Sequence, residues 1–274
     1  MKLSDVPIVC ISLNRRPDRW ATIQAGAAAS GLDVQRLEAV DAKEFVAHKH
    51  PDITLGVAHN ILFGKRRAHY EIDTAGAIGA SLSHFKAWNQ LKASAAPAMI
   101  VFEDDLHIPA DLKGRLETIL AAAPDEWDMI QLQQTEFGDG SKGCAPMKGA
   151  SDDNPWTTCT SLMGAHAYIV SRRGADRLLE KAYPIEMHVD AYMAYMSRMG
   201  HISMLWHPLV NLYVQYQGSD IDHGEEPILQ VPTDMRKAGI VALKVPAVLG
   251  LMTLAAVAGG ILAISFWKRG IIGR

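Results

Sequence analysis

Short apolar runs rich in β-branched residues alternate with alanine-rich helical patterns along most of the chain, and this alternation limits the possible folds more than any other feature. Strands are predicted over 6–13, 34–40, 98–102, 127–132 and 167–170. Helices are predicted over 20–30, 77–93 and 173–182. The run at 98–102 is apolar at every position, as expected for a strand buried on both faces. The chain is therefore predicted to have a layered α/β fold.

The C-terminal region contains a segment, 245–267, without a single charged residue. As a helix it would be about 35 Å long, which is enough to cross a hydrocarbon core of ~30 Å. Trp267 and the flanking Lys244, Lys268 and Arg269 resemble interfacial anchors, while the alternative is a buried core helix. The 274 residues are thus predicted to form one globular domain at 1–230, a linker at 231–244, a transmembrane helix at 245–267 and a basic tail at 268–274.

The N-terminal sequence and the cysteines bear on the compartment. The first apolar run is only about eight residues long and has an Asp and a Pro before it, so it is not expected to be a signal peptide. The three cysteines have no CxxC spacing and an odd total, which predicts neither a disulfide framework nor a cysteine-based zinc site. We therefore expect a tail-anchored membrane protein whose globular domain faces a reducing cytoplasm.

The charge distribution predicts no nucleic-acid partner. The formal net charge is −3, and the single short basic run at 65–67 is better interpreted as a solvated loop than as part of a basic stripe. A Gly-, Ser-, Asp- and Pro-rich stretch at 138–155 is predicted to be a long loop.

Three consecutive carboxylates follow the apolar strand at 98–102. Neighbouring carboxylates repel one another, and solvent, protonation or a cation must relieve that repulsion. Because side chains alternate along an extended chain, Glu103 and Asp105 share one side and are predicted to hold a divalent cation. Asp104 is predicted to point the other way, where it could bind a ribose hydroxyl. The alternative is an acidic surface turn ahead of Pro109.

Five separated segments resemble, in order, glycosyltransferase family 25, which includes bacterial lipooligosaccharide galactosyltransferases and collagen galactosyltransferases. These segments are "IVCISLNRRPDRW", "GAIGASLSHFKAW", "IVFEDD", "HAYIVSRRGADRLL" and "HVDAYM". The resemblance spans 6 to about 222. It implies a GT-A fold, which is a Rossmann-like nucleotide-sugar-binding domain, together with a UDP-galactose or UDP-glucose donor. It also implies a divalent metal, Mn²⁺ or Mg²⁺, and transfer with inversion.

The resemblance assigns the metal and the nucleotide to particular residues. Asp105 is expected to be the first direct metal ligand and Glu103 the second, in place of the family's DxD motif. The residues expected to face the nucleotide are Asn14, Arg15, Arg16, Arg19 and Asp41. Arginine can pair bidentately with phosphate, although a solvated helix start capped by Asn14 is the alternative. Ala42 replaces the glycine that the family usually has after this aspartate.

The segment "GAIGASLSH" is expected to supply donors to sugar or phosphate oxygens. Ser81, Ser83 and His84 lie in its first helical turns, and Gly79 would allow close backbone approach. The alternative is helix capping plus a packed histidine. Ala77 stands where the family usually has Glu, so that carboxylate is absent from this chain.

An inverting transfer needs a base for the acceptor hydroxyl. Asp190 is predicted to be that base and Glu186 is its rival, while the alternative is that Asp190 only caps a helix. His188 could be an extra metal or phosphate ligand. The residues that could line the acceptor side are Gln215, Ser219 and Asp220.

The predicted function is inverting, metal-dependent transfer of a hexose from a UDP-sugar to a glycan, glycolipid or protein acceptor at a membrane, as in lipopolysaccharide biosynthesis. The changed Ala42 and Ala77 leave a second possibility, a catalytically silent nucleotide-sugar-binding or scaffold protein of the same fold.

Overall fold

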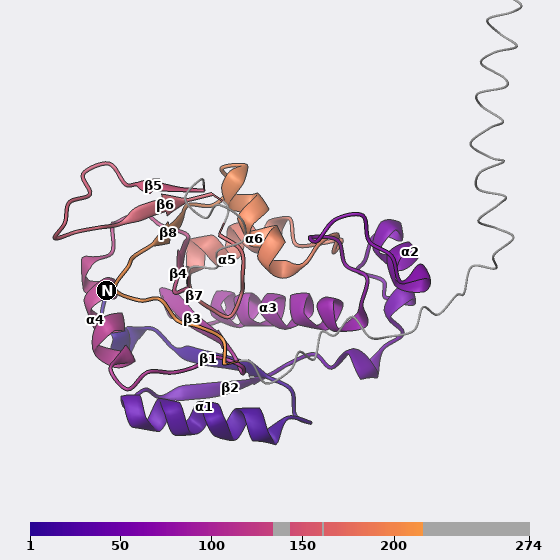
Figure 1. The fold of residues 1–274 in the computed structure, drawn as a ribbon, viewed down its shortest axis with the longest axis horizontal. Coiled ribbons are helices and arrows are strands. Elements are labelled where there is room, and N and C mark those ends of the chain that lie inside the picture. The colour runs from indigo at the N-terminus through magenta and orange to yellow at the C-terminus, as the bar shows by residue number, and fades with distance from the viewer. Residues whose placement is uncertain (134–142, 161, 216–274) are drawn as a thin grey trace, which may run out of the picture. The chain divides into compact units, whose positions relative to one another are not determined.

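The computed structural model describes residues 1–133, 143–160 and 162–215, which form a sheet with helices on both faces (Figure 1). The strands are β1 (Ile8–Ser12), β2 (Val34–Glu38), β3 (Ala98–Glu103), β4 (Met129–Gln131), β5 (Cys144–Pro146), β6 (Thr157–Cys159), β7 (Ala167–Ser171) and β8 (Met204–Trp206). The helices of more than one turn are α1 (Pro17–Ser30), α2 (Leu55–Phe63), α3 (Ala75–Ala93), α4 (Leu112–Ala122), α5 (Arg172–Glu180) and α6 (Val189–Arg198). The predicted α/β class is confirmed.

The predicted elements correspond to β1, β2, β3, β4, β7, α1, α3 and α5, with ends shifted by up to three residues. Two helices, α2 and α4, and the short strands β5, β6 and β8 were not predicted. Three-residue strands are too short to display a period, so sequence pattern cannot distinguish them from loops. The predicted loop at 138–155 was wrong in part, because it contains β5.

The strand order in the described sheet is β2-β1-β3-β7-β4-β8-β6-β5. β1 is parallel to β2 and β3, whereas β7 runs antiparallel between β3 and β4. β4 and β8 are parallel. Therefore β1, β3, β4 and β8 all end on the same side of the sheet, which we call the carboxyl edge, and they begin at the opposite amino edge.

Alternate residues of the central strands enter two hydrophobic cores. On one face, Met99 and Val101 pack with residues of α3, α5 and α6. On the other face, Ile100 and Phe102 pack with α1 and α4. All four side chains are buried, so the prediction of a strand covered on both faces is confirmed. These cores fix the direction in which β3 delivers the acidic residues that follow it.

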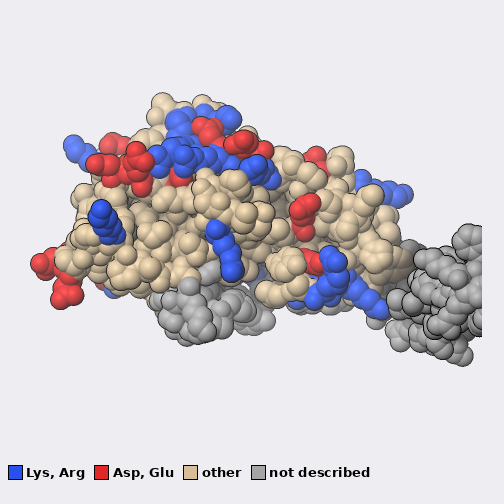
Figure 2. Space-filling model, turned by 90° about the horizontal axis from the view of Figure 1, so that it is seen from above, with Lys and Arg blue, Asp and Glu red and all other residues tan. Residues whose placement is uncertain are grey.

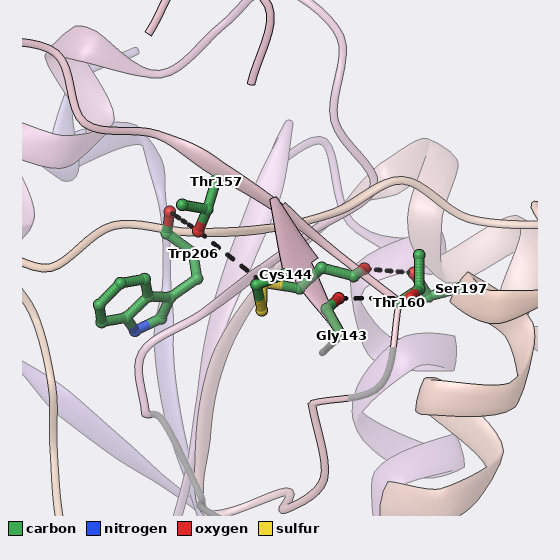
Figure 3. The surroundings of a disulfide bond; sticks show 7 residues. Gly143, Cys144, Thr157, Thr160, Ser197 and Trp206 are labelled. Atoms are coloured by element: carbon green, nitrogen blue, oxygen red, sulfur yellow. Dashed lines mark hydrogen bonds between the residues drawn. A yellow bond between two sulfur atoms is a disulfide. The ribbon is translucent and has the colours of Figure 1, made fainter. Parts of the chain in front are cut away.

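The expectation of no disulfide was wrong. Cys144 on β5 and Cys159 on β6 are opposite each other in the ladder and are disulfide-bonded (Figure 3). Spacing along the chain carries no information about strand pairing, which is what brings these thiols together. Ser197 of α6 donates a hydrogen bond to the Cys159 carbonyl at 2.7 Å, which ties this hairpin to the helix. Disulfides are rare in reducing compartments, so the cysteines no longer support one.

No helix within the three described ranges is long and apolar enough to cross a membrane. The predicted linker at 231–244, transmembrane helix at 245–267 and basic tail at 268–274 lie outside these ranges. On the face of the molecule in Figure 2, basic and acidic side chains gather side by side, in agreement with the nearly balanced composition.

Candidate active site

A pocket lies at the carboxyl edge, where β1 and β3 end beside the first turns of α3. Its lining includes most of the residues predicted to bind metal or nucleotide, but not Asn14, Arg16 or Ser81. The lining residues are Ile11, Leu13, Arg15, Arg19, Ala39, Val40, Asp41, Ala42, Gly76, Gly79, Ala80, Ser83, His84, Glu103, Asp104 and Asp105. Open α/β sheets bind ligands in a crevice of this kind, beyond the carboxyl ends of the strands.

Two ionic groups close one side of the pocket. Arg15 forms an ion pair with Asp41, with 2.8 Å between Nε and Oδ2. Asn14 does not line the pocket, and its side-chain amide donates to Glu38. Arg16 pairs with Asp18, with 2.8 Å between Nη2 and Oδ2. Of the first predicted group, Arg15 and Asp41 are therefore the residues held together at the pocket.

Helix α3 approaches the loop after β2 closely. A Cβ atom on Gly79 would lie 2.7 Å from the carbonyl oxygen of Val40, which is closer than side chains tolerate. Ser83 accepts a hydrogen bond from the Val40 amide at 2.8 Å and donates to the Gly79 carbonyl at 2.6 Å. The hydroxyl proton of Ser83 is thus directed at the helix, and its contact with Val40 fixes the loop that carries Asp41.

Asp104 is compensated by a buried arginine. Nη1 of Arg19 lies 3.1 Å from Oδ1 of Asp104, and the two side chains are only 6% and 10% exposed. This pair joins α1 to the acidic motif. Among the three consecutive acids, Asp104 is therefore the one with a buried arginine as its partner.

Glu103 lies between two histidines. His84 Nε2 is 3.1 Å from Oε1, and His166 Nδ1 is 2.8 Å from Oε2. Burial would raise the pKa of Glu103, but the charge and hydrogen bond of His166, together with His84, hold that pKa below its usual range. In the metal-free protein Glu103 is therefore an ionised carboxylate with both oxygens engaged.

Asp105 is only partly compensated, by the charges of His166 and Arg19. Its Oδ1 is buried and has no hydrogen-bond partner in the described structure, and it forms a long ion pair with His166 Nδ1 at 3.8 Å. Burial and the charge of Glu103 raise the pKa of Asp105 to about 6. One donor atom from each of Glu103, Asp105 and His166 lies within 4.8 Å of the others, a cluster that could hold a metal ion. The unpartnered oxygen supports this use of the cluster.

His166 was not among the predicted site residues. Burial would lower its pKa, but Glu103 and Asp105 raise that pKa to about 9. His166 comes directly before β7, and the amide of Glu103 donates to the His166 carbonyl at 2.8 Å. The available signal in the sequence was its position directly before an apolar run. Nothing in the sequence said that β7 runs antiparallel beside β3, which is what brings His166 to the carboxyl edge.

Asp190 lies in the first turn of α6, outside the pocket lining but close enough to His166 to raise the pKa of that residue. Its Oδ2 accepts from the Gly164 amide at 3.2 Å and its Oδ1 from the Ala191 amide at 2.7 Å. The rival Glu186 is exposed and lines a different groove, beside Tyr183 and other residues. Of the two candidate bases, Asp190 is therefore the one that lies near His166.

The remaining predicted residues are partly described. The amide of Gln215 donates to the Asp105 carbonyl at 2.7 Å, which places this segment beside the acidic motif. Ser219 and Asp220 lie outside the described residues. His188 precedes α6, and burial lowers its pKa.

Residues 6–193 match the model of glycosyltransferase family 25 (LPS biosynthesis protein). A glycosyltransferase 25 family member from Aedes aegypti is 29% identical over 69% of this chain and 30% of its own length. Procollagen galactosyltransferase 1-A from Xenopus laevis is 25% identical over 85% of this chain and 36% of its own. A probable inactive family member 3 from Bos taurus is 28% identical over 63% of this chain and 28% of its own. The chain spans about a third of the length of these relatives.

Proposed function

Because the chain belongs to glycosyltransferase family 25, we propose that it transfers a hexose, galactose or glucose, from a UDP-sugar to a hydroxyl group of a glycan, glycolipid or protein, with inversion. The observation that carries this proposal is the unpartnered Oδ1 of Asp105 beside Glu103 and His166, in a pocket at the carboxyl edge. A site with surplus negative charge and a carboxylate oxygen that accepts no hydrogen bond fits a divalent cation.

The metal would be held by Asp105 with Glu103 and His166. Two carboxylates and one imidazole suit Mn²⁺ better than Mg²⁺, which prefers oxygen ligands throughout. When bound, the ion would stabilise the negative charge of the leaving diphosphate. Asp104 stays outside this set because Arg19 already neutralises it.

The donor nucleotide would lie along the pocket. Asp41, held by Arg15, borders the side near the β2 loop, and Asp104, held by Arg19, borders the side near β3. Carboxylates fixed in this way can accept hydrogen bonds from ribose hydroxyls without being reoriented. The pairing of each acid with an arginine also limits repulsion between the pocket and a diphosphate.

Asp190 would act as the general base. The acceptor oxygen forms a bond to the anomeric carbon while the bond from that carbon to the diphosphate oxygen breaks, and the acceptor proton passes to the Asp190 carboxylate. The amides of Gly164 and Ala191 hold this carboxylate in place. Asp190→Asn is expected to retain UDP-sugar binding and to lose most transfer.

The proposal is tested by measuring Mn²⁺-dependent release of nucleotide from a panel of UDP- and GDP-sugars. We expect release from UDP-galactose or UDP-glucose, and its loss in Asp105→Ala with unchanged circular dichroism. Asp111→Ala is the matched control, because Asp111 is an exposed acid paired with Arg115 at 2.6 Å on α4. Full release by Asp105→Ala would remove the metal assignment.

A catalytically silent protein of the same fold is the second candidate. Ala77 stands at the family's usual Glu position, and some of the similar proteins are named as inactive. Such a protein would bind UDP in the presence of Mn²⁺ but would release none from any sugar in the panel. Binding without release therefore separates the two candidates.

The membrane setting is a further part of the proposal. The uncharged segment 245–267 would tether the enzyme beside a membrane-bound acceptor. Leu254→Arg, which puts a charge in the middle of the segment, is expected to move the full-length chain out of the membrane fraction. Val241→Arg adds the same charge outside the segment and is expected to leave the fractionation unchanged.

A further inference from the structure

A buried chain of hydrogen bonds runs from the hydrophobic core to Glu103. The indole Nε1 of Trp88 donates to the Tyr168 hydroxyl at 2.9 Å. That hydroxyl lies 2.8 Å from Nδ1 of His84, whose Nε2 is 3.1 Å from Oε1 of Glu103. Trp88 and His84 belong to α3, Tyr168 to β7 and Glu103 to β3, so the chain ties three elements to one carboxylate.

The chemistry of the four groups gives this chain a direction. An indole N–H only donates, so the Tyr168 oxygen accepts from Trp88, and the single hydroxyl proton of Tyr168 is available to donate to His84. An ionised carboxylate only accepts, so Nε2 of His84 must carry the proton that faces Glu103. Nδ1 of His84 is then the acceptor for the Tyr168 hydroxyl. Every donor in the chain is used, and His84 is the Nε2–H tautomer.

The burial of these groups makes the arrangement rigid. Trp88 and Tyr168 are 0% exposed and His84 is 1% exposed. Polar groups buried this deeply are costly unless they are hydrogen-bonded, so each member depends on the next. Ring side chains packed in a core have few alternative rotamers. Oε1 of Glu103 is therefore held from the core side, while Oε2 contacts His166 at 2.8 Å.

We propose that Trp88, Tyr168 and His84 are positioning residues that hold the Glu103 carboxylate in the orientation the metal site requires. This inference rests on the proposed function, because it assumes that the Glu103, Asp105 and His166 cluster binds a divalent ion. Groups that orient metal ligands from behind typically contribute 10- to 100-fold to metal affinity. The inference also gives His84 a role different from donating to the sugar nucleotide.

The test compares two Tyr→Phe variants of the full-length protein. Tyr168→Phe removes the hydroxyl in the middle of the series of hydrogen bonds. Tyr192→Phe removes a hydroxyl that donates to the Leu178 carbonyl at 2.6 Å and has no contact with Glu103. Tyr192 packs near the same tryptophan, with 6.4 Å between the ring centroids of Trp88 and Tyr192. Both variants are expected to lose similar melting temperature.

The decisive measurement is the Mn²⁺ dissociation constant of the substrate-free protein by calorimetry. We expect it to weaken about tenfold in Tyr168→Phe and to be unchanged in Tyr192→Phe. His84→Gln, whose amide can still donate to Glu103, should retain more affinity than His84→Ala. At saturating Mn²⁺, the kcat of Tyr168→Phe should recover toward the wild-type value.

Two outcomes separate this inference from the proposed function. If the wild type binds Mn²⁺ and Asp105→Asn does not, but Tyr168→Phe binds as tightly as Tyr192→Phe, the positioning role alone is overturned. If the wild type binds no Mn²⁺, the proposed function and this inference both fall. Nitrogen NMR of the metal-free protein tests the chain directly: we expect the Nε2–H tautomer at His84, and an Nδ1–H tautomer would contradict the direction assigned to it.

Discussion

Asp128 and Asp105 follow opposite rules for a carboxylate at the end of a strand. Asp128 is 0% exposed, and its oxygens accept from Arg173 at 2.7 Å, Arg177 at 2.6 Å and the Ser203 amide at 2.8 Å. Asp105 has other acids beside it and a buried Oδ1 that lacks a hydrogen-bond partner in the part of the chain described. One charge is fully compensated and the other is not.

The two carboxylates also lie at opposite edges of the sheet. Asp128 directly precedes β4, whereas Asp105 follows β3, and both strands are antiparallel to β7. The compensated carboxylate is therefore at the amino edge and the uncompensated one at the carboxyl edge. A compensated buried charge serves the fold, while an uncompensated one at a pocket is a candidate for binding a cation.

The largest effect is expected from Asp105→Asn. Removing this charge should abolish Mn²⁺ binding and reduce nucleotide release at least about 100-fold, because a carboxylate of the proposed metal site, with its buried oxygen that has no hydrogen-bond partner, is lost. The free energy of unfolding of the metal-free variant should rise by about 1 kcal/mol, since repulsion by Glu103 is relieved. Calorimetry and chemical denaturation measure the two quantities. A less stable variant would contradict the lack of compensation.

Asp128→Asn should show the reverse pattern. It leaves Arg173 and Arg177 without their carboxylate, and the free energy of unfolding should fall by about 2 kcal/mol; half-exposed arginines keep this below the cost of breaking a fully buried pair. Mn²⁺ affinity should be unchanged. Weaker Mn²⁺ binding in this variant would show that the two edges are coupled.

The pH should affect metal binding and stability at the carboxyl edge. The pKa of Asp105 is raised from 3.8 to about 6 by burial and Glu103, so protonation of Asp105 stabilises the folded metal-free protein at low pH. This contribution to the free energy of unfolding is lost as the pH rises from about 4 to 6. The pKa of His166 is raised to about 9, mainly by Glu103 and Asp105 against burial. Because ligands must lose their protons, Mn²⁺ affinity should increase from pH 6 to 9 in calorimetric titrations. A flat profile would exclude both groups as ligands.

Two glycines give the smallest and most specific comparison. A Cβ on Gly174 would lie 2.1 Å from the Asp128 carbonyl oxygen at the amino edge, so Gly174→Ala should lower the melting temperature of the protein. A Cβ on Gly79 would lie 2.7 Å from the Val40 carbonyl oxygen, so Gly79→Ala should weaken UDP binding a few-fold by displacing the Asp41 loop. Gly114→Ala, with nothing within 4 Å, is the control and should be neutral or slightly stabilising. Equal effects of Gly79→Ala and Gly114→Ala on UDP binding would contradict the close approach.

The sequence predicted those parts of the fold and site that depend on local pattern. The apolar run at 98–102 and the acids that follow it could be placed because strand burial and alternation are visible in a single segment. His166 and the Cys144–Cys159 disulfide could not be predicted, since both depend on which strands are neighbours. The same limit applies to the hydrogen bond that Ser83, which lines the pocket as expected, accepts from the Val40 amide across a helix–loop contact.

The compensated Asp128 cluster has a consequence for how such chains change over time. Substitution of Asp105 relieves electrostatic repulsion, whereas substitution of Asp128 leaves Arg173 and Arg177 without their partner. Mutations that abolish activity can therefore leave the protein as stable as before, and an inactive descendant can keep the same fold.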